Sequence, residues 1–256
     1  MVKYLLKKSY RHKDLKELKF NDLWDYNGVF TTMWIYGKPP KILFFNSHIN
    51  SLVKSLKVFK IIKKDIKKKI LKLISLNINK KKSYNHLLRV ALNKNIISIS
   101  LRQRIKPKKN FYLKLVNYKR IKPEYKNLKY KIILKYLSKI NTSKNDIALC
   151  VNKKVLETGT SNLIFVSKNL IYSPVSKFYK GNNFKFYEKK FKIKKRNILI
   201  KELIKYDEII LLGSGKGVVS VKSIEEINWK RRSQKIYKKL LHTFQSEVKK
   251  QKYLYN

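Results

Sequence analysis

The chain has 256 residues, of which 63 are Lys or Arg and 15 are Asp or Glu, so its formal net charge is +48. Eight of the basic residues are Arg and 55 are Lys, whereas sequence-specific nucleic-acid contacts depend heavily on the Arg guanidinium. With 43% hydrophobic and 12% aromatic residues, the chain can bury a substantial core, which excludes an intrinsically disordered protein. We therefore do not expect a nucleic-acid partner, despite the charge.

Cysteine content and hydropathy narrow the class further. Cys150 is the one cysteine, so a disulfide framework within the chain and a multi-cysteine zinc site are excluded. The apolar residues around it predict a buried structural thiol, in a reducing compartment. No apolar run approaches the ~18 residues that a membrane span requires, and the N-terminus lacks a signal-peptide core. We expect a cytoplasmic protein with no membrane partner and no metal.

The first elements predicted along the chain are a hairpin and two helices. Residues 29–36 are β-branched and aromatic, and they are followed by the turn at residues 37–40 and a second strand at residues 42–45. Apolar residues then recur at helical spacing from Ser47, the expected N-cap, to Phe59. A second helix is predicted over residues 66–74.

Three further strands complete a first half that is mixed α+β with a meander-like sheet. These strands cover residues 87–92, 96–101 and 111–116. A polar segment containing Pro123 then predicts a connector. We expect a small N-terminal domain of residues 1–117, a connector of residues 118–125 and a larger C-terminal domain of residues 126–256.

The second half repeats the alternation of helices and strands. Its predicted elements are a helix at 132–140, four short strands between 147 and 174, a mostly helical basic segment at 185–204, two strands at 208–212 and 218–221, and an amphipathic helix from Ile236 to Val248. We expect the last helix to pack on this second sheet.

A glycine-rich segment, Gly213–Gly217, directly follows one of these apolar strands. It fails as a nucleoside-triphosphate motif, because Ile210 stands where the leading Gly is needed and Gly217 stands where Ser or Thr would hold the metal. Its backbone N–H groups can still hold a single phosphate. Taken alone, the segment is equally well interpreted as a tight turn between strands.

Two charged residues are candidates for chemistry. Glu157 is a carboxylate in an otherwise apolar strand, and an unpaired buried charge is costly, so a buried Glu157 requires a cationic or N–H partner. Exposure on an edge strand is the alternative. Lys126 follows the connector, but among 55 Lys its simplest interpretation is an exposed side chain.

Taken together and in this order, these three features resemble the class IV aminotransferase family, the pyridoxal-phosphate enzymes of fold type IV. Lys126–Tyr130 is similar to the segment of the family's catalytic lysine. Glu157 and Asn162 are similar to its Glu and Asn, which stand five apart. Asp207–Gly217 is similar to its acidic pair, apolar strand and second phosphate loop.

The resemblance extends into the first half and runs from about residue 22 to 245. Gly28–Thr32 is similar to the family's G-V-F-E-T segment, and His48–Ser55 to its H-L-x-R-L-x-x-S helix. Three positions depart from the family pattern. Ser51 stands where the phosphate-binding Arg is usual, the loop at residues 179–184 keeps its Gly but loses its Thr, and Lys129 replaces the usual Asn.

The resemblance implies a two-domain fold type IV enzyme, with a small α/β N-terminal domain, a barrel-like C-terminal sheet, pyridoxal 5'-phosphate as cofactor and a homodimeric assembly. Lys126 would form the Schiff base and then act as the general acid and base. Glu157 would accept the pyridinium N–H, and Tyr130 would hydrogen-bond the ring oxygen.

The remaining candidates surround the phosphate and the substrate. The phosphate would be held by Asn182, Asn183, Ser214 and Gly215, with Lys54 as the nearest cation to replace the missing Arg. Arg102 and Arg104 lie two apart on a predicted strand and therefore on one face, so they are candidates for substrate carboxylates. Exposed basic side chains are the alternative.

Three activities within the family fit a small amino or carboxylate substrate: branched-chain aminotransferase, D-amino-acid aminotransferase and 4-amino-4-deoxychorismate lyase, which forms 4-aminobenzoate and pyruvate in folate biosynthesis. The short chain favours the lyase. Thr32 favours it too, since the resemblance places its hydroxyl toward the substrate; packing beside Phe30 is the alternative. A hypothesis from another class is a basic nucleic-acid-binding protein on a decayed enzyme scaffold, whose affinity would fall steeply with salt.

Overall fold

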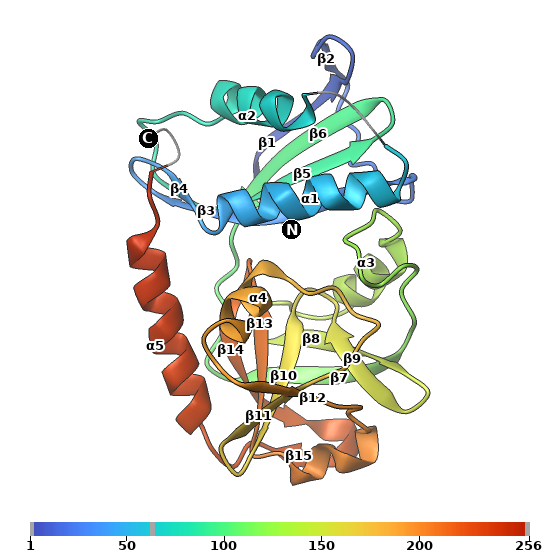
Figure 1. The fold of residues 1–256 in the computed structure, drawn as a ribbon, viewed down its shortest axis with the longest axis vertical. Helices are drawn as coiled ribbons and strands as arrows, with labels where there is room; N and C mark the ends of the chain where they lie inside the picture. The colour runs from blue at the N-terminus through green and yellow to red at the C-terminus, as the bar shows by residue number, and fades with distance from the viewer. Residues whose placement is uncertain (1–2, 62–64, 254–256) are drawn as a thin grey trace. The chain divides into compact units, whose positions relative to one another are not determined.

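The structure, a computed structural model, describes residues 3–61 and 65–253. It divides the chain into two compact units, each with its own sheet (Figure 1). Unit 1 comprises Met1–Arg104, Tyr125–Lys131 and Lys250–Asn256, and unit 2 comprises Ile105–Glu124 and Ile132–Lys249. Among the helices in the described residues, none is long and apolar enough to cross a membrane.

Unit 1 contains an antiparallel sheet, whose strand order in the described residues is β2-β1-β6-β5-β3-β4. Its strands are β1 (Tyr4–Arg11), β2 (Glu17–Leu18), β3 (Gly28–Gly37), β4 (Lys41–Ile42), β5 (Tyr84–Asn93) and β6 (Ile96–Gln103). Along β3 the side chains alternate between the two faces: Val29, Met33 and Ile35 are fully buried in the core, whereas Thr32 and Trp34 are half-buried.

Two helices cover the buried face of this sheet, α1 (Phe45–Val58) and α2 (Ile66–Asn77). Both helices and the β3–β4 hairpin are confirmed, but the boundary between hairpin and helix differs from the expectation. The strand expected at residues 42–45 ends at Ile42, and Ser47 lies inside α1 rather than at its cap. Phe44 adopts a left-handed conformation that turns the chain into the helix, which an apolar run does not reveal.

The segment Tyr125–Lys131 runs beside the start of β3 and belongs to unit 1. The N–H of Phe30 donates to the carbonyl of Lys126 at 2.9 Å, and the N–H of Leu128 donates to the carbonyl of Gly28 at 3.0 Å. A Cβ on Gly28 would lie 2.2 Å from the carbonyl oxygen of Leu92, so a glycine is required at this crossing. Backbone hydrogen bonds thus fix the position of Lys126 on the sheet of unit 1.

The C-terminal residues also return to unit 1. The N–H of Phe44 donates to Oε1 of Gln251 at 3.2 Å, and Nζ of Lys41 lies 4.7 Å from the ring centroid of Tyr253. Unit 1 is therefore assembled from three separate parts of the chain.

Unit 2 contains a larger mixed sheet, in the order β12-β11-β10-β13-β14-β7-β8-β9, with β15 paired to β14. Its strands are β7 (Phe111–Asn117), β8 (Asn145–Val151), β9 (Lys154–Thr158), β10 (Asn162–Ser167), β11 (Leu170–Ser173), β12 (Ile193–Lys195), β13 (Glu208–Gly213), β14 (Gly217–Ile224) and β15 (Trp229–Lys230). The four strands expected between residues 147 and 174 are confirmed.

Strand β7 lies in the other unit from the one we expected. We placed it in the N-terminal domain, but it pairs in parallel with β8 and β14 of unit 2. The boundary expected at residue 117 consequently falls within unit 2, and Lys126 falls within unit 1. Local sequence specifies that a segment is a strand, but its partners depend on contacts that are distant in the chain.

Short helices complete unit 2: α3 (Lys131–Ser138), α4 (Asn182–Glu188), η1 (Ile200–Lys205), η2 (Glu225–Ile227) and α5 (Lys235–Lys250). The helical segment expected at residues 185–204 is wrong, because α4 ends at Glu188 and β12 follows it as an edge strand. The amphipathic α5 is confirmed and buries Leu240 and Phe244. Its start is capped by buried Glu208, which accepts from the N–H groups of Ile236 and Tyr237 at 2.9 and 2.8 Å.

Candidate active site

Lys126 lies against a cluster of aromatic side chains in unit 1. Its Nζ is 5.2 Å from the ring centroid of Phe30. The Phe30 ring in turn contacts Tyr130 and Trp24 edge-on, at centroid distances of 5.4 and 5.0 Å, and Trp24 stacks on Tyr130 at 5.8 Å. The half-buried lysine is therefore placed at an aromatic surface, and the segment that the sequence singled out brings Lys126 and Tyr130 to the same cluster.

Arg89 joins this aromatic cluster, and sequence reasoning missed it. Its Cζ lies 3.7 Å from the ring centroid of Trp24 and 5.2 Å from that of Phe30. Nη2 donates to the carbonyl of Asp22 at 2.8 Å, while Nε has no hydrogen-bond partner in the described part of the chain. Burial lowers the pKa of Arg89 to about 10, which leaves it protonated at neutral pH. The guanidinium is thus a half-buried cation that stacks on Trp24 and makes a hydrogen bond to the backbone.

A sequence signal for Arg89 existed. It interrupts an apolar strand between Leu88 and Val90, as Glu157 interrupts its own strand. A charged residue within such a pattern requires a partner or a ligand. The cost of an unpaired buried charge, which makes Glu157 a candidate, makes Arg89 a candidate as well.

The other substrate candidates lie on the same face of the sheet. Thr32 is paired directly with Arg89 across β3 and β5, and Arg102 is paired with Leu87, which is itself paired with Trp34. Residues directly opposite one another in an antiparallel pair point to the same side of the sheet. Thr32, Trp34, Arg89 and Arg102 therefore share one face, the one that also carries Phe30.

Arg102 and Arg104 are half-buried rather than fully exposed. Burial lowers the pKa of both guanidinium groups. The Cζ of Arg104 lies 4.1 Å from the ring centroid of Trp34, so this arginine is partly occupied by a cation–π contact. Their role in substrate binding stays a prediction.

In unit 2, Glu157 lies on the edge strand β9, yet it is only 5% exposed. Its Oε1 forms an ion pair with Nη1 of Arg120 at 2.6 Å, and its Oε2 accepts from the N–H of Tyr179 at 3.4 Å. The prediction that a buried Glu157 has a cationic partner is confirmed, and exposure on the edge strand is wrong. The partner, Arg120, is 6% exposed and was not foreseen.

The Gly213–Gly217 loop, which joins β13 to β14, is fixed at its start by close packing. A Cβ on Gly213 would lie 2.3 Å from Oγ and 3.1 Å from Cβ of Ser161, so any other residue here would require Ser161 to shift. Nδ2 of Asn183 donates to the carbonyl of Gly213 at 3.0 Å. The structure thus joins Asn183 and the glycine-rich loop, as the phosphate-site prediction requires.

Asn162 organises the neighbouring loop. Its Oδ1 accepts from the N–H of Gly181 at 2.9 Å, and its Nδ2 donates to the carbonyl of Tyr179 at 2.5 Å. Asn182 and Asn183, which follow, are buried, whereas Ser214 and Gly215 are half-buried. The buried Oδ1 of Asn183 has no hydrogen-bond partner among the described residues.

Two predicted positions on α1 are also defined. Ser51, where the family's arginine is missing, is half-buried, and its carbonyl accepts from Oγ of Ser55 at 2.9 Å. Lys54, one turn further along the helix, is exposed. Among residues 3–61 and 65–253, no anionic group forms an ion pair with Lys54, and its role stays a prediction.

Cys150 is buried, as the sequence predicts, and is 4% exposed. Burial raises the pKa of its thiol to about 11, which keeps it protonated and unreactive at neutral pH. Within the described residues, no group of His, Cys, Asp and Glu side chains is arranged to bind a metal.

Solved structures with the same fold are numerous. The branched-chain aminotransferase of Thermoproteus uzoniensis, determined with norvaline, aligns with a TM-score of 0.76 at 16% identity, over 96% of this chain and 97% of that one. The branched-chain aminotransferase of Escherichia coli aligns with a TM-score of 0.75 at 13% identity, over 94% and 93%. A Legionella pneumophila protein assigned as a 4-amino-4-deoxychorismate lyase aligns with a TM-score of 0.69 at 18% identity, over 86% and 91%.

These structural likenesses confirm the predicted fold class. Among curated protein sequences, none matches this one significantly. The sequence nevertheless matches the amino-transferase class IV family over residues 28–224, which is most of the chain. The chain therefore belongs to the class IV amino-transferase family of pyridoxal-phosphate-dependent enzymes.

Proposed function

We propose that this enzyme is a 4-amino-4-deoxychorismate lyase, which converts aminodeoxychorismate into 4-aminobenzoate and pyruvate. One observation carries the proposal. The hydroxyl-bearing Thr32 is paired directly with the half-buried Arg89, on the sheet face that carries the Phe30 ring beneath Lys126. Assembly as a homodimer stays a prediction, which light scattering of the purified protein would test.

The residues present fit the cofactor. The described residues supply a lysine at an aromatic surface, a buried carboxylate, and a loop whose Gly213 packs too closely for any side chain. Lys126 would hold the cofactor's aldehyde carbon, Glu157 its pyridinium N–H, Tyr130 its ring oxygen, and Asn182, Asn183, Ser214 and Gly215 its phosphate. When bound, pyridoxal phosphate supplies an electron sink that stabilises negative charge at the substrate's amino-bearing carbon.

The buried ion pair supports the role proposed for Glu157. A carboxylate that accepts a pyridinium N–H must be anionic, and an anion inside a protein requires a compensating charge. Arg120 supplies that charge at 2.6 Å from Oε1, and the N–H of Tyr179 donates to Oε2 at 3.4 Å.

Lys126 is proposed to move the proton. Its amine would take the proton from the ring carbon that carries the amino group, and the C–O bond to the enolpyruvyl group on the neighbouring carbon would then break. Protonation of the departing enolpyruvate gives pyruvate, and the ring becomes aromatic. An amine placed by backbone hydrogen bonds on a sheet is well oriented for such a transfer.

Arg89 and Thr32 would act on the substrate directly. A desolvated guanidinium binds a carboxylate strongly and can do so through two parallel hydrogen bonds. The substrate carries two carboxylates, and Arg89 would bind one of them. The hydroxyl of Thr32 would donate a hydrogen bond to the oxygen of the departing enolpyruvyl group, which favours cleavage over return of the proton.

Product analysis tests the proposal. The purified protein is incubated with pyridoxal phosphate and aminodeoxychorismate, and both products are measured. We expect 4-aminobenzoate and pyruvate to form in equal amounts. We expect Thr32→Val to lower turnover by about 10²-fold, the effect of losing a group positioned for proton transfer, while cofactor binding is kept. Thr243→Val, a half-buried threonine on α5, is the matched control.

Formation of glutamate from leucine and 2-oxoglutarate, without 4-aminobenzoate from aminodeoxychorismate, would instead identify an aminotransferase. A protein that takes up no pyridoxal phosphate and binds nucleic acid with a steep dependence on salt would be a decayed enzyme scaffold.

A further inference from the structure

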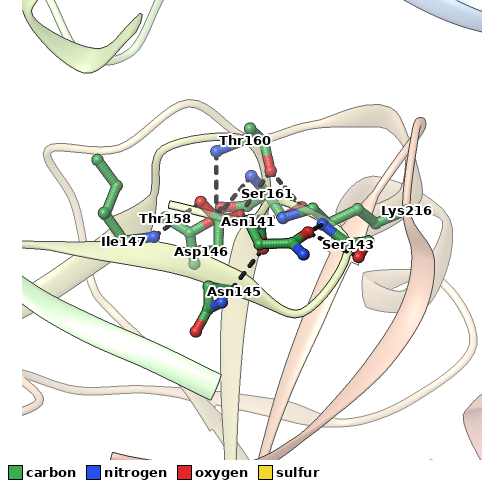
Figure 2. A network of polar contacts seen from close by, with 9 residues as sticks. All are labelled: Asn141, Ser143, Asn145, Asp146, Ile147, Thr158, Thr160, Ser161 and Lys216. Carbon is green, nitrogen blue, oxygen red and sulfur yellow. Dashed lines mark hydrogen bonds and ion pairs between the residues drawn. The ribbon is translucent and has the colours of Figure 1, made fainter. Parts of the chain in front are cut away.

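A buried aspartate in unit 2 collects an unusual number of donors in a chain with 15 acidic residues. Asp146, at the start of β8, has a fully buried side chain. Its Oδ2 accepts from Nζ of Lys216 at 2.8 Å, Oγ1 of Thr158 at 2.9 Å and Oγ1 of Thr160 at 2.6 Å, and its Oδ1 accepts from the N–H of Ile147 at 2.9 Å (Figure 2).

Lys216 is the lysine of the Gly213–Gly217 loop. In a nucleoside-triphosphate loop the corresponding lysine contacts the phosphates. Here its side chain is 11% exposed, its Nζ pairs with Asp146, and the same Nζ lies 4.7 Å from the ring centroid of Phe111. Its charge is therefore compensated inside the protein, and its effect on a bound anion must be exerted through the shape of the loop.

The ion pair holds the far end of a loop whose near end is already fixed. At the near end, Gly213 packs against Ser161 and accepts from Asn183. At the far end, Lys216 is tied to Asp146. Ser214 and Gly215, the two residues proposed to contact the phosphate, lie between these attachments. Backbone N–H groups bind a phosphate well only when they are held pointing toward one place.

The same aspartate also holds the turn that follows Glu157. Thr158 and Thr160 donate to Asp146, and the N–H of Ser161 donates to Oγ1 of Thr158 at 2.8 Å. Figure 2 shows the side chains from the two loops meeting at this one carboxylate. Asp146 thus connects the segment of Glu157 with the glycine-rich loop, and these are the segments proposed to bind the two ends of the cofactor.

We propose that Asp146 and Lys216 are positioning residues, whose buried ion pair sets the glycine-rich loop for the cofactor's phosphate and fixes its separation from Glu157. This inference rests on the proposed phosphate site at Ser214 and Gly215. Neither residue contacts the cofactor. Loss of Lys216 weakens binding of the phosphate group and leaves the turn after Glu157 in place, because Thr158 and Thr160 still donate to Asp146.

The test compares pyridoxal phosphate with pyridoxal, which lacks the phosphate, using equilibrium dialysis against the full-length chain. Wild-type protein prefers pyridoxal phosphate. Lys216→Met lowers the affinity for pyridoxal phosphate by about 10- to 100-fold, as expected for weakening one or two charge-assisted hydrogen bonds, and changes the affinity for pyridoxal by less than about twofold. Lys222→Met, an exposed lysine on β14, is the matched control and leaves both affinities unchanged.

Asp146→Asn separates positioning from direct contact. If Lys216 positions the loop, this variant also loses its preference for pyridoxal phosphate. If Lys216 instead reaches the phosphate, releasing it from Asp146 leaves that preference unchanged or larger, and the inference is overturned. Asp146→Asn also serves if Lys216→Met does not fold, and Thr160→Val, which removes one donor and keeps the ion pair, gives a smaller loss of about threefold.

Different results would contradict the proposed phosphate site and the positioning role of Asp146 and Lys216. A wild-type protein that binds neither compound, or that binds both equally, contradicts the phosphate site itself. A wild-type protein that prefers pyridoxal phosphate, together with a folded Lys216→Met or Asp146→Asn variant that keeps the full preference, contradicts the positioning role alone.

Discussion

Removing Arg120 tests how the protein keeps a carboxylate ionised in its interior. The substitution Arg120→Met keeps much of the side-chain volume but leaves Glu157 buried without its cation. The two charges are 2.6 Å apart, and their side chains are 5% and 6% exposed. At an effective dielectric constant of 20, such a pair attracts by about 6 kcal/mol, against which the cost of removing both groups from water must be set.

The expected loss of stability follows from that balance. Breaking a buried pair by removing one partner costs about 3–5 kcal/mol, because the remaining charge is uncompensated. For a chain of this size, that loss lowers the midpoint of thermal unfolding by roughly 6 to 20 °C. Removing both charges in Arg120→Met/Glu157→Gln should recover part of it, since no charge is left buried alone.

Thermal and urea unfolding of the cofactor-free protein, followed by circular dichroism, measures the effect. Arg232→Met is the matched control, because the pair of Arg232 with Asp207 is 3.1 Å long but 48% and 32% exposed, and such a pair contributes at most about 1 kcal/mol. The reasoning is refuted if Arg120→Met destabilises no more than Arg232→Met, or if the double variant is no more stable than the single one.

Three further predictions concern the proposed site. Borohydride reduction of the protein with pyridoxal phosphate, followed by peptide mapping, should label Lys126, and a label confined to another lysine would contradict the assignment. Ser51→Arg should tighten binding of pyridoxal phosphate, since Arg offers a bidentate fork that Lys54 lacks, and an unchanged or weaker affinity in a titration would show that this helix is misaligned with the family pattern. Arg89→Met should raise KM for a carboxylate substrate by about tenfold or more. The cofactor-free variant should stay as stable as the wild type, because the desolvation penalty is removed together with the charge. A large loss of stability with an unchanged KM would make Arg89 a structural residue.

The sequence was most informative about features that depend on neighbouring residues and about groups whose unpaired burial would cost much free energy. A run of β-branched and aromatic residues predicted β3, and helical spacing predicted α1, α2 and α5. The cost of an unpaired charge predicted that Glu157 would have a cation beside it if buried. It could not predict that the cation would be Arg120, because 63 basic residues offer too many candidates and only the folded chain brings one of them near.

The incorrect predictions concern features that depend on contacts between residues distant in the chain. Strand β7 was expected in the sheet of the N-terminal domain, but it pairs with β8 and β14 of unit 2. Its own seven residues do not specify these partners. The segment at residues 185–204 was predicted to be mostly helical, but β12 within it forms hydrogen bonds with β11 that local sequence does not reveal. Lys216 was considered only as part of a glycine-rich segment that resembles a nucleotide motif. Its partner Asp146 lies 70 residues earlier in the chain.

The return of the segment after α5 to unit 1 has a consequence for synthesis on the ribosome. The N–H of Phe44 donates to Gln251, which is added after all of unit 2. Segment Tyr125–Lys131, which pairs with β3, also arrives after the whole of the six-stranded sheet described for unit 1 has been made. All of unit 2, Ile105–Glu124 and Ile132–Lys249, precedes Gln251 in the chain, so it can fold before unit 1 is complete, reversing the usual order in which N-terminal domains fold first. Until then, the nascent chain carries an unfinished N-terminal sheet, whose edge at the start of β3 stays open until the segment that bears Lys126 has been made.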